Sequence, residues 1–383
     1  MVRKLKNIAH AWESNLASFF YGRPAKKIFT IGVTGTDGKT TTASLIFHIL
    51  KTAGFKPSMI TTVAAQIGEE IYDTGLHTTT PSAFTLQKYI RRAVDAKSDY
   101  LVLEVTSHAL DQNRVDGVNF KIGVLTNITH DHLDYHRTRQ AYIEAKSKLF
   151  SLAETAVLNK DDSSFGALKK ILQNKHITTY SIHDKNDLKL PKLTSFNASN
   201  FLAAAKVARV LGIDNAIIQR ALLNFKLPEG RQEIAYDSDF RIVIDFAHTP
   251  NAFENILSEI KKNTRGKLIH VFGSAGQRDK SKRPLMGEIS SRYSDIIILT
   301  IEDSRSEKVE DINAQIKIGM KDFKGELVEI RDRQEAINFA VRKAQKGDTV
   351  IITGKGHEKS MNLGRGEEPW SDHEAVRKAV SRK

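Results

Sequence analysis

The sequence contains no cysteine, which excludes disulfide bonds and thiolate metal sites and fits a reducing cytoplasm. Long apolar runs are absent too, because no stretch reaches the roughly 18 apolar residues that a membrane-spanning helix needs. No secretory signal with a cleavage site is visible at the start of the chain. These absences lead us to expect a cytoplasmic protein without a membrane-spanning helix.

Acidic residues are fewer than basic ones, with 45 Asp and Glu against 58 Lys and Arg and a formal net charge of +13. An anionic partner would suit this excess, whether a nucleotide, an acidic substrate, a nucleic acid or a membrane surface. A lysine-rich solvated surface is the simpler explanation. Because the basic residues form no long block and no stripe interleaved with aromatic side chains, we expect no nucleic-acid binding.

Strand-like apolar runs alternate with helical patterns along the 383 residues, which are enough for two or three domains. This alternation predicts an α/β protein with mostly parallel sheets covered by helices on both faces. The expected strands are 28–33, 100–105, 122–127, 156–159, 241–246, 267–272, 295–300 and 349–353. The expected helices are 39–53, 84–96, 141–152, 198–211, 250–262 and 333–344. A break between two α/β blocks is expected near residues 227–230.

The pattern in the first 27 residues predicts a separate helix. Apolar residues recur there at helical spacing, at Leu5, Ile8, Trp12, Leu16 and Phe19. Basic residues gather at its start: Arg3, Lys4 and Lys6. We expect this helix to pack on the domain that follows. The alternative is an interfacial helix, or one that docks a partner.

Residues 28–42, IFTIGVTGTDGKTTT, carry the strongest local signal. A β-rich run ends in a glycine loop, and Lys39 and three threonines then open a helix. The backbone N–H groups of such a loop and the helix N-terminus form a phosphate cradle. Lys39 would reach the terminal phosphates, and Thr40 would offer its hydroxyl to Mg²⁺. The strict P-loop pattern needs glycine where this chain has Val33, which indicates a narrower family than the general NTPases.

Two further features indicate a metal-dependent site. Glu104 ends an apolar run, and a carboxylate at the carboxyl end of a buried strand beside a P-loop is a usual Mg²⁺ ligand. Residues 126–136, TNITHDHLDYH, hold three histidines and two aspartates, a density more typical of a site than of a core. Zinc is conceivable there, but the phosphate loop makes Mg²⁺ the better fit.

Ordered motifs make the chain resemble the Mur ligases, ATP-dependent amide-forming enzymes of peptidoglycan precursor synthesis in the cell wall. The first are GVTGTDGKTTT, EVTSHALDQNRVDGVNF, TNITHDHLDYH and YIEAKSKLF. Others follow at 196–200 (FNASN), 229–233 (EGRQE), 245–251 (DFAHTPN), 273–287 (GSAGQRDKSKRPLMG), 302–307 (EDSRSE) and 354–358 (GKGHE). The later blocks are most similar to the MurE type, the UDP-N-acetylmuramoyl-tripeptide synthetases.

The resemblance implies a P-loop central ATPase domain with a mostly parallel sheet, followed by a Rossmann-like C-terminal domain. The expected ranges are a helical extension at 1–27, the central domain at 28–228 and the C-terminal domain at 229–383. Full-length relatives carry an N-terminal domain that binds the UDP end of the precursor, and most of that site is expected to be missing here. We expect a monomer that acts on small-molecule substrates, with a membrane or protein partner at the first helix as an open possibility.

The resemblance also implies the chemistry. A substrate carboxylate would attack the γ-phosphate of ATP, and an amino acid would then displace phosphate from the acyl phosphate. The implied catalytic residues are Lys39, Glu104, His132 and Lys146. Thr40 and Glu104 would hold one Mg²⁺, and His132 with a carbamylated Lys146 would help hold a second.

Binding residues are implied in the same way. The implied ATP-binding residues are Gly35, Thr36, Asp37, Gly38, Lys39, Thr40, Thr41, Asn197, Asn200, Arg231, Asp245 and His248. The implied acceptor-binding residues are Thr79, Thr80, Ser107 and Arg114. The implied amino-acid-binding residues are Asp303, Arg305, Gly354 and Glu358.

Two departures from the family affect these expectations. Asp37 replaces the usual asparagine of the loop and would weaken ATP binding unless it faces away or helps hold metal. The motif Asp-Asn-Pro-Arg of diaminopimelate-adding enzymes reads Asp303-Ser304-Arg305 here. Arg305 favours an amino acid with a second carboxylate, such as meso-diaminopimelate, over lysine.

Three alternatives stay open at this point. One is another ligase of the same family, of the folylpolyglutamate or cyanophycin type, although GSAGQRDKSKRP and GKGHE are not expected there. A second is a nucleotide-binding module that needs a partner, which the retention of Lys39, Glu104, His132 and Lys146 disfavours. A nucleic-acid NTPase is supported by the net charge alone.

Overall fold

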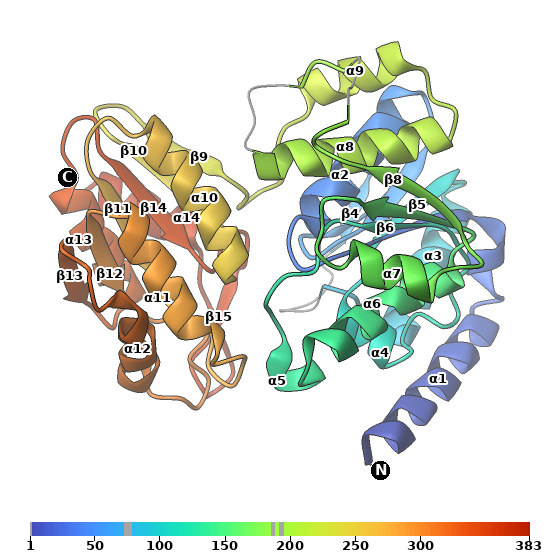
Figure 1. Cartoon of the computed structure of the whole chain (residues 1–383), viewed down its shortest axis with the longest axis horizontal. Helices are drawn as coiled ribbons and strands as arrows, with labels where there is room; N and C mark the ends of the chain where they lie inside the picture. Colours follow the sequence, from blue (N-terminus) through green and yellow to red (C-terminus); the bar gives the residue numbers. More distant parts are fainter. Residues whose placement is uncertain (1, 73–78, 185–187, 191–194) are drawn as a thin grey trace. The chain divides into compact units, whose positions relative to one another are not determined.

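The computed structural model describes residues 2–72, 79–184, 188–190 and 195–383, with side chains described from Asn7 onward and, after the last gap, from Phe196. Two compact units make up the chain (Figure 1). The first unit contains Met1–Thr129 and Thr138–Lys226, and the second contains His130–Arg137 and Leu227–Lys383. The short segment His130–Arg137 therefore belongs to the second unit, although the chain on both sides of it belongs to the first.

An eight-stranded sheet forms the centre of the first unit, in the order β4-β3-β2-β5-β1-β6-β7-β8. Its strands are β1 (Phe29–Thr34), β2 (Pro57–Ile60), β3 (Ala65–Ile67), β4 (Glu70–Tyr72), β5 (Tyr100–Glu104), β6 (Phe120–Leu125), β7 (Thr155–Asn159) and β8 (His176–Tyr180). The strands from β2 to β8 in this order are parallel, and β3 and β4 add an antiparallel edge. Strand β1 lies in the middle, between β5 and β6.

Helices cover both faces of this sheet. They are α1 (Val2–Phe20), η1 (Pro24–Lys27), α2 (Lys39–Thr52), α3 (Ala83–Asp95), α4 (Ser107–Asp111), α6 (Arg139–Leu152), α7 (Phe165–Ile171), α8 (Ser195–Val210) and α9 (Asn215–Asn224). Ile31 and Val33 of β1 pack into the core under α2, α8 and α9. Gly32 faces α6, where a Cβ would lie 2.7 Å from Cδ1 of Leu149. Burial on both faces explains why the central strands read as nearly continuous apolar runs.

The second unit has a six-stranded sheet in the order β13-β12-β11-β14-β10-β9. Its strands are β9 (Glu233–Asp237), β10 (Arg241–Asp245), β11 (Leu268–Phe272), β12 (Ile296–Leu299), β13 (Glu326–Glu329) and β14 (Thr349–Thr353). All pairs are parallel except that of β9 with β10. A separate hairpin joins β15 (Ser360–Asn362) to β16 (Glu367–Pro369).

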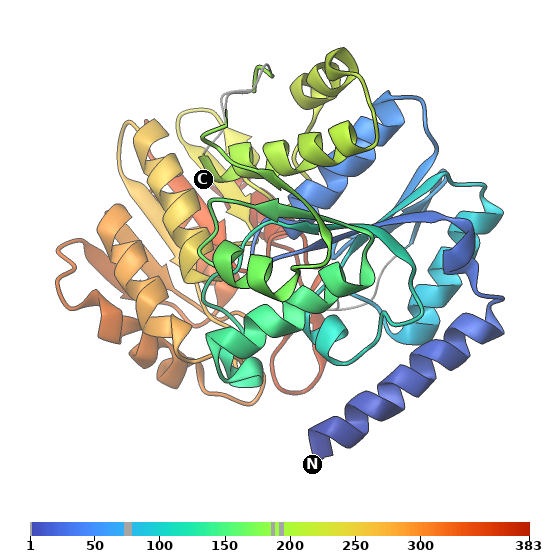
Figure 2. The same ribbon diagram turned by 45° about the vertical axis from the view of Figure 1, so that its right-hand side comes forward.

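Helices lie on both faces of this second sheet (Figure 2). An apolar core fills the space between the sheet and the helices on each face. Helices α10 (Pro250–Asn263), α11 (Lys282–Tyr293) and α12 (Val309–Lys317) cover one face, and α13 (Arg333–Lys343) and α14 (Asp372–Val380) cover the other. The unit also holds α5 (Leu133–His136) and η2 (Ile318–Met320).

The predicted α/β class with mostly parallel sheets is confirmed. Every strand and helix expected from the sequence is present, with bounds shifted by a few residues at most. None of the helices in the described part of the chain combines the length and the apolar character that a membrane crossing needs.

Candidate active site

The glycine loop lies at the carboxyl end of β1, and α2 begins directly after it at Lys39. Gly38 has a φ of 79°, and a Cβ there would lie 2.3 Å from Oδ1 of Asn200. At Gly35 a Cβ would lie 1.8 Å from Oγ1 of Thr126. Both positions need glycine because neighbouring side chains approach the loop backbone this closely.

The segment after β6 holds the loop in place. The backbone N–H of Thr36 donates to the carbonyl oxygen of Asn127 (2.8 Å), and Oγ1 of Thr126 donates to the carbonyl oxygen of Asp37 (2.7 Å). Oδ1 of Asn127 accepts from the N–H of Asp37 at 3.0 Å, and Oδ2 of Asp37 accepts from Oγ1 of Thr129 at 3.3 Å. The carboxylate that departs from the family pattern therefore has a hydrogen-bond donor in Thr129.

Lys39 and two threonines form the first turn of α2, where helical N–H groups have no helical acceptor and favour an anion. Thr40 and Thr41 are buried, and Nζ of Lys39 donates to the carbonyl oxygen of Thr36 at 2.8 Å. The ammonium group is thus folded back over the loop. Loop, helix terminus and cation together provide the groups that a nucleotide phosphate needs.

Glu104, the last residue of β5, is hydrogen-bonded to the helix that follows the phosphate loop and to the segment after β2. Its Oε2 accepts from Oγ1 of Thr40 and from the N–H of Thr62, both at 3.0 Å. A hydroxyl and a carboxylate are ligands that suit Mg²⁺. Within the described residues, no cluster of three or more His, Asp or Glu side chains could hold a metal ion by itself. A cation at this pair would therefore take further ligands from phosphate oxygens and water.

Lys146 lies behind the same loop, on α6. It is 1% exposed, and its Nζ donates to the carbonyl oxygen of Gly35 at 2.7 Å. The ammonium group also lies 4.6 Å from the ring centroid of Tyr142, whose hydroxyl is 3.1 Å from Oγ1 of Thr36. A lysine from a distant helix is thereby brought to the first glycine of the cradle.

The predicted acceptor residues gather beside Glu104. Oγ1 of Thr80 donates to the Glu104 carbonyl oxygen at 3.1 Å, and Nη1 of Arg114 donates to the Thr80 carbonyl oxygen at 3.0 Å. Oγ1 of Thr79 accepts from Oγ1 of Thr62 at 3.1 Å. Ser107 is buried at the start of α4, just beyond β5.

Asn197 and Asn200, the predicted adenine neighbours, are buried on α8. Oδ1 of Asn200 accepts from Oγ1 of Thr42 at 3.3 Å, and its Nδ2 donates to Oδ1 of Asn197 at 3.4 Å. Helix α8 is therefore tied by side-chain hydrogen bonds to the helix that follows the phosphate loop.

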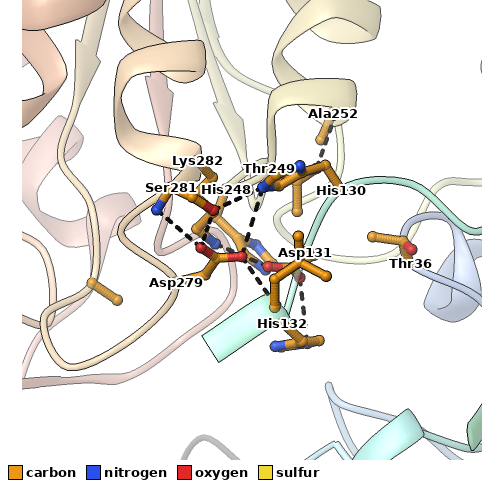
Figure 3. Close-up of polar contacts among 12 residues, drawn as sticks. Thr36, His130, Asp131, His132, His248, Thr249, Ala252, Asp279, Ser281 and Lys282 are labelled. Atoms are coloured by element: carbon orange, nitrogen blue, oxygen red, sulfur yellow. Dashed lines mark hydrogen bonds and ion pairs between the residues drawn. The ribbon is translucent and has the colours of Figure 1, made fainter. Parts of the chain in front are cut away.

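The histidine-rich segment packs within the second unit (Figure 3). Buried Asp131 lies 3.3 Å from Nζ of Lys282 and 3.3 Å from Nε2 of His132. The N–H of Leu133 donates to Oδ2 of Asp279 at 3.1 Å, and Nε2 of His130 is hydrogen-bonded to Oγ of Ser281 at 2.9 Å. These ties anchor the segment to the loop 273–281 and the start of α11.

Positively charged groups surround the carboxylate of Asp131 in this cluster. Burial alone would raise the pKa of Asp131, but positive charge on His132, Lys282 and His248 outweighs it and lowers that pKa well below the ordinary range. Asp131 and Lys282 were not among the predicted site residues, although both lie inside quoted motifs. Since His132 belongs to this second unit, the first unit brings together only the other predicted metal residues, which are Thr40, Glu104 and Lys146, around one loop.

Three predicted nucleotide residues meet at the end of β10. Asp245 accepts from the N–H of Gln232 (2.7 Å) and of Ala247 (2.6 Å), so backbone donors fix its carboxylate. The guanidinium of Arg231 lies 4.4 Å from the ring centroid of Phe246, and Nδ1 of His248 is 2.9 Å from the Phe246 carbonyl oxygen.

The residues predicted to bind the incoming amino acid lie around Lys355, which was not among the predicted site residues. Nζ of Lys355, 0% exposed, lies 2.8 Å from Oδ1 of Asp303 and 2.5 Å from Oε2 of Glu358. Burial lowers the pKa of Lys355, but these two carboxylates outweigh burial and raise it. Arg305 has a φ of 51°, and its Nη1 donates to the Gly276 carbonyl oxygen at 2.6 Å.

Glu302 is the most unusual acid of this group. It is buried beside Gly354, where an added Cβ would lie 2.6 Å from Oε2 of Glu302. That Oε2 has no hydrogen-bond partner among the residues that the structure describes. Burial, reinforced by the negative charge of Asp303, raises the pKa of Glu302 to about 7. The side chain therefore passes between neutral and charged forms near neutral pH.

We expect this raised pKa to make stability depend on pH. A buried acid with a raised pKa favours the folded state below its unfolded value of 4.5, and this contribution is lost as the pH rises through about 7. The free energy of unfolding should fall by about 3 kcal/mol across this window relative to Glu302→Gln, at roughly 1.4 kcal/mol for each pKa unit.

Urea unfolding measures this difference. Trp12 and Trp370 are the two tryptophans, so Trp370 emission in a Trp12→Phe background reports on the second unit. Urea unfolding curves at pH 5 and pH 8 should show that the free energy of unfolding falls more for the protein with Glu302 than for Glu302→Gln. Parallel behaviour at both pH values would mean that Glu302 has an ordinary pKa.

Comparison with known proteins agrees with a P-loop ligase assignment. Residues 33–202 match the Mur ligase middle domain, and residues 230–356 match the glutamate ligase domain of Mur ligases. A UDP-N-acetylmuramoyl-L-alanyl-D-glutamate–2,6-diaminopimelate ligase of Caldanaerobacter subterraneus subsp. tengcongensis is 37% identical, over 97% of this chain and 82% of the relative. The enzyme of the same name from Aquifex aeolicus is 38% identical, over 94% of this chain and 79% of the relative.

Solved structures agree. A structure of the same type of ligase has 32% identity and a TM-score of 0.61, covering 93% of this chain and 78% of that one. Mycobacterium tuberculosis folylpolyglutamate synthase, solved with ADP and AMPPCP, has a TM-score of 0.72 at 16% identity over 90% and 92% of the two chains, which shows the shared fold alone. The class defined by fold and site is thus an ATP-dependent ligase with a P-loop. The chain belongs to the Mur ligase family.

Proposed function

We propose that the protein joins an amino acid to a free carboxylate of a muramoyl-dipeptide precursor, using ATP and forming an amide bond. The amino acid and the precursor that it joins are small molecules, as the names of the relatives indicate for those proteins. One arrangement carries the proposal: Lys39, the Thr40–Glu104 pair and buried Lys146 all meet the same glycine loop.

The reaction has two steps. A carboxylate oxygen of the acceptor attacks the γ-phosphorus of ATP, ADP leaves, and an acyl phosphate forms. The amine of the incoming amino acid then attacks the acyl carbon, phosphate leaves, and the amine loses a proton. Because phosphoryl transfer spreads charge over the γ-phosphate oxygens, positioning and charge stabilisation are the main tasks of the protein.

Residues of the loop meet these needs. The N–H groups at the start of α2 face the phosphates, and Lys39 neutralises charge that develops on them. Gly35, Thr36, Asp37, Gly38 and Thr41 complete the cradle. Mg²⁺, held by Thr40 and Glu104, would polarise the phosphate oxygens.

Lys146 is proposed to react with carbon dioxide. Its amine and CO₂ would give a carbamate and release a proton, converting a cation into an anionic oxygen ligand. Its 1% exposure and its place against the Gly35 carbonyl oxygen support this role, because the modified group would lie beside the phosphate cradle. With His132, the carbamate would help hold a second Mg²⁺.

Nucleotide and acceptor contacts complete the proposal. Asn197 and Asn200 would lie near the adenine, and Arg231, Asp245 and His248 near the phosphates and ribose. The acceptor would contact Thr79, Thr80, Ser107 and Arg114. Hydrogen bonds link Thr79, Thr80 and Arg114 to the Glu104 region.

The amino acid is proposed to be a diamino acid with two carboxylates, as in the names of the relatives. Arg305 would pair with one carboxylate. Gly354 and Glu358 would lie around the far ammonium group, and Asp303 would be a further residue of the amino-acid site. The Lys355 contacts to Asp303 and Glu358 support this arrangement, because they hold both carboxylates at the end of β14.

The wider biology is proposed on the same basis. We propose a monomer in the cytoplasm that does not bind nucleic acid. The proposed domains are a helical extension at 1–27, the ATP-binding domain at 28–228 and the C-terminal domain at 229–383.

Phosphate release tests the substrate assignment. ATP, Mg²⁺ and UDP-MurNAc-L-Ala-D-Glu are supplied with meso-diaminopimelate, with L-lysine or with no amino acid. We expect release with meso-diaminopimelate alone. Phosphate release with L-lysine instead would show that L-lysine is the amino acid added. If no phosphate is released in any of the three reactions although ATP binds, the proposed acceptor would be wrong.

A further inference from the structure

Helix α1 packs on the first unit through its small polar side. Ser14 and Ala17 are 0% exposed and Ser18 is 8% exposed. Oγ of Ser14 donates to the Arg114 carbonyl oxygen at 3.0 Å, and Nδ2 of Asn7 donates to the Asp111 carbonyl oxygen at 2.7 Å. The usual orientation of an amphipathic helix is reversed here, since its polar residues face the protein.

The outer side of α1 is apolar and uncovered in the described chain. The exposed fractions are 55% for Ile8, 75% for Trp12, 60% for Leu16, 68% for Phe19 and 71% for Phe20. Figures 1 and 2 both show α1 on the outside of the first unit. We call these five residues the apolar face of α1. Single exposed apolar residues are common, but a contiguous aromatic patch marks an interaction surface.

Basic residues border the apolar face. The guanidinium of Arg23 lies 5.9 Å from the Phe19 ring centroid, and exposed Lys26 and Lys27 follow in η1. Arg3, Lys4 and Lys6 precede the face in the sequence. Glu13 is the single acidic residue of α1, and its Oε2 lies 3.3 Å from Nδ1 of His10. The border is therefore positively charged.

We propose that the apolar face of α1 binds the surface of an anionic lipid membrane, with the helix lying in the plane of the interface. Tryptophan and phenylalanine rings with a basic border suit the boundary between headgroups and acyl chains. The positive border and the net charge of +13 complement anionic headgroups. This inference does not depend on the proposed reaction, because α1 holds none of the proposed site residues.

The same charge argues against a second copy as the occupant. Two apolar faces brought together would also bring their basic borders together, and each chain carries +13. An anionic membrane removes this repulsion and covers the exposed rings at the same time.

Vesicle binding of the full chain tests the proposal. In a Trp370→Phe background, Trp12 is the only tryptophan of the 383 residues, and selective excitation of tryptophan reports on it. We expect the protein to co-sediment with vesicles containing phosphatidylglycerol, with a blue shift of Trp12 emission, and to bind phosphatidylcholine vesicles weakly. Raising the salt concentration should weaken binding.

Matched substitutions locate the surface. Leu16→Asn with Phe19→Asn should lower the vesicle partition coefficient about tenfold or more while ATP binding is unchanged. Ile318→Asn, at a residue of the second unit that is 55% exposed like Ile8, should leave the partition coefficient unchanged. Absence of binding to phosphatidylglycerol vesicles, or binding that the double substitution does not weaken, would overturn the proposal. Concentration-dependent dimers abolished by the double substitution would overturn it in favour of a second copy.

Discussion

Replacing Lys39 with alanine is expected to lower kcat for amide formation by a factor of about 10³ or more. In the structure, Nζ of Lys39 reaches the Thr36 carbonyl oxygen of the same loop, so the ammonium group is already held over the cradle. Loss of this cation would remove an ammonium group that neutralises the charge developing during phosphoryl transfer. Steady-state phosphate release with saturating substrates measures the effect.

Lys51→Ala is the matched control for this substitution. Lys51 is an exposed lysine in the last turn of the same helix, α2. We expect its kcat to equal that of the wild type. If Lys39→Ala kept more than about a tenth of the wild-type kcat, Lys39 would not stabilise the transferring phosphoryl group.

Lys146→Ala should likewise abolish turnover, and the wild type should depend on bicarbonate. Removing dissolved carbon dioxide should lower activity, and adding bicarbonate should restore it, because the carbamate forms reversibly. A short carboxylic acid such as acetate should partly rescue Lys146→Ala by placing an anionic oxygen in the vacated space. A merely structural lysine would show neither effect.

Lys148→Ala serves as the control on the same helix. Nζ of Lys148 donates to the carbonyl oxygens of Leu110 (3.3 Å) and Asp111 (3.4 Å) and to Oδ1 of Asn113 (3.5 Å), so its hydrogen bonds tie α6 to α4. It should retain activity and the same response to bicarbonate as the wild type. Full activity of Lys146→Ala would refute the carbamate.

The sequence predicted most of the interior strands because burial on both faces leaves a clear apolar pattern, but it missed β2, Pro57–Ile60, which lies between β3 and β5. Strand β14, Thr349–Thr353, was predicted at its observed bounds. Edge strands were missed: β13, Glu326–Glu329, is mostly exposed and β16, Glu367–Pro369, fully so. Such strands are fixed by backbone pairing with a neighbour, which a residue pattern does not record.

Helix α1 shows a second limit. The apolar spacing predicted the helix, but not which side packs on the protein. Leu5 belongs to that spacing, although its side chain lies outside the described part. The buried side of α1 contains Ser14, Ala17 and Ser18, and its hydrogen bonds from Asn7 and Ser14 reach residues about a hundred positions away. Periodicity cannot contain such partners.

The candidate site divides in the same way. The phosphate loop and its helix are contiguous in sequence, so their geometry could be predicted from glycine, lysine and threonine spacing. The contact between Lys146 and Gly35 and that between Lys355 and Asp303 join distant segments. Family resemblance indicated Lys146, whereas no pattern marked Lys355 as the partner of two acids.

Isotope transfer from the acceptor to phosphate tests the proposed acyl-phosphate route. The acceptor is prepared with ¹⁸O in its reacting carboxylate, and the phosphate released during amide formation is analysed by mass spectrometry. An acyl-phosphate route predicts one ¹⁸O atom in each phosphate, because the attacking carboxylate oxygen stays with phosphorus when the amine displaces it. Phosphate free of ¹⁸O would contradict the account and show that ATP is hydrolysed by water.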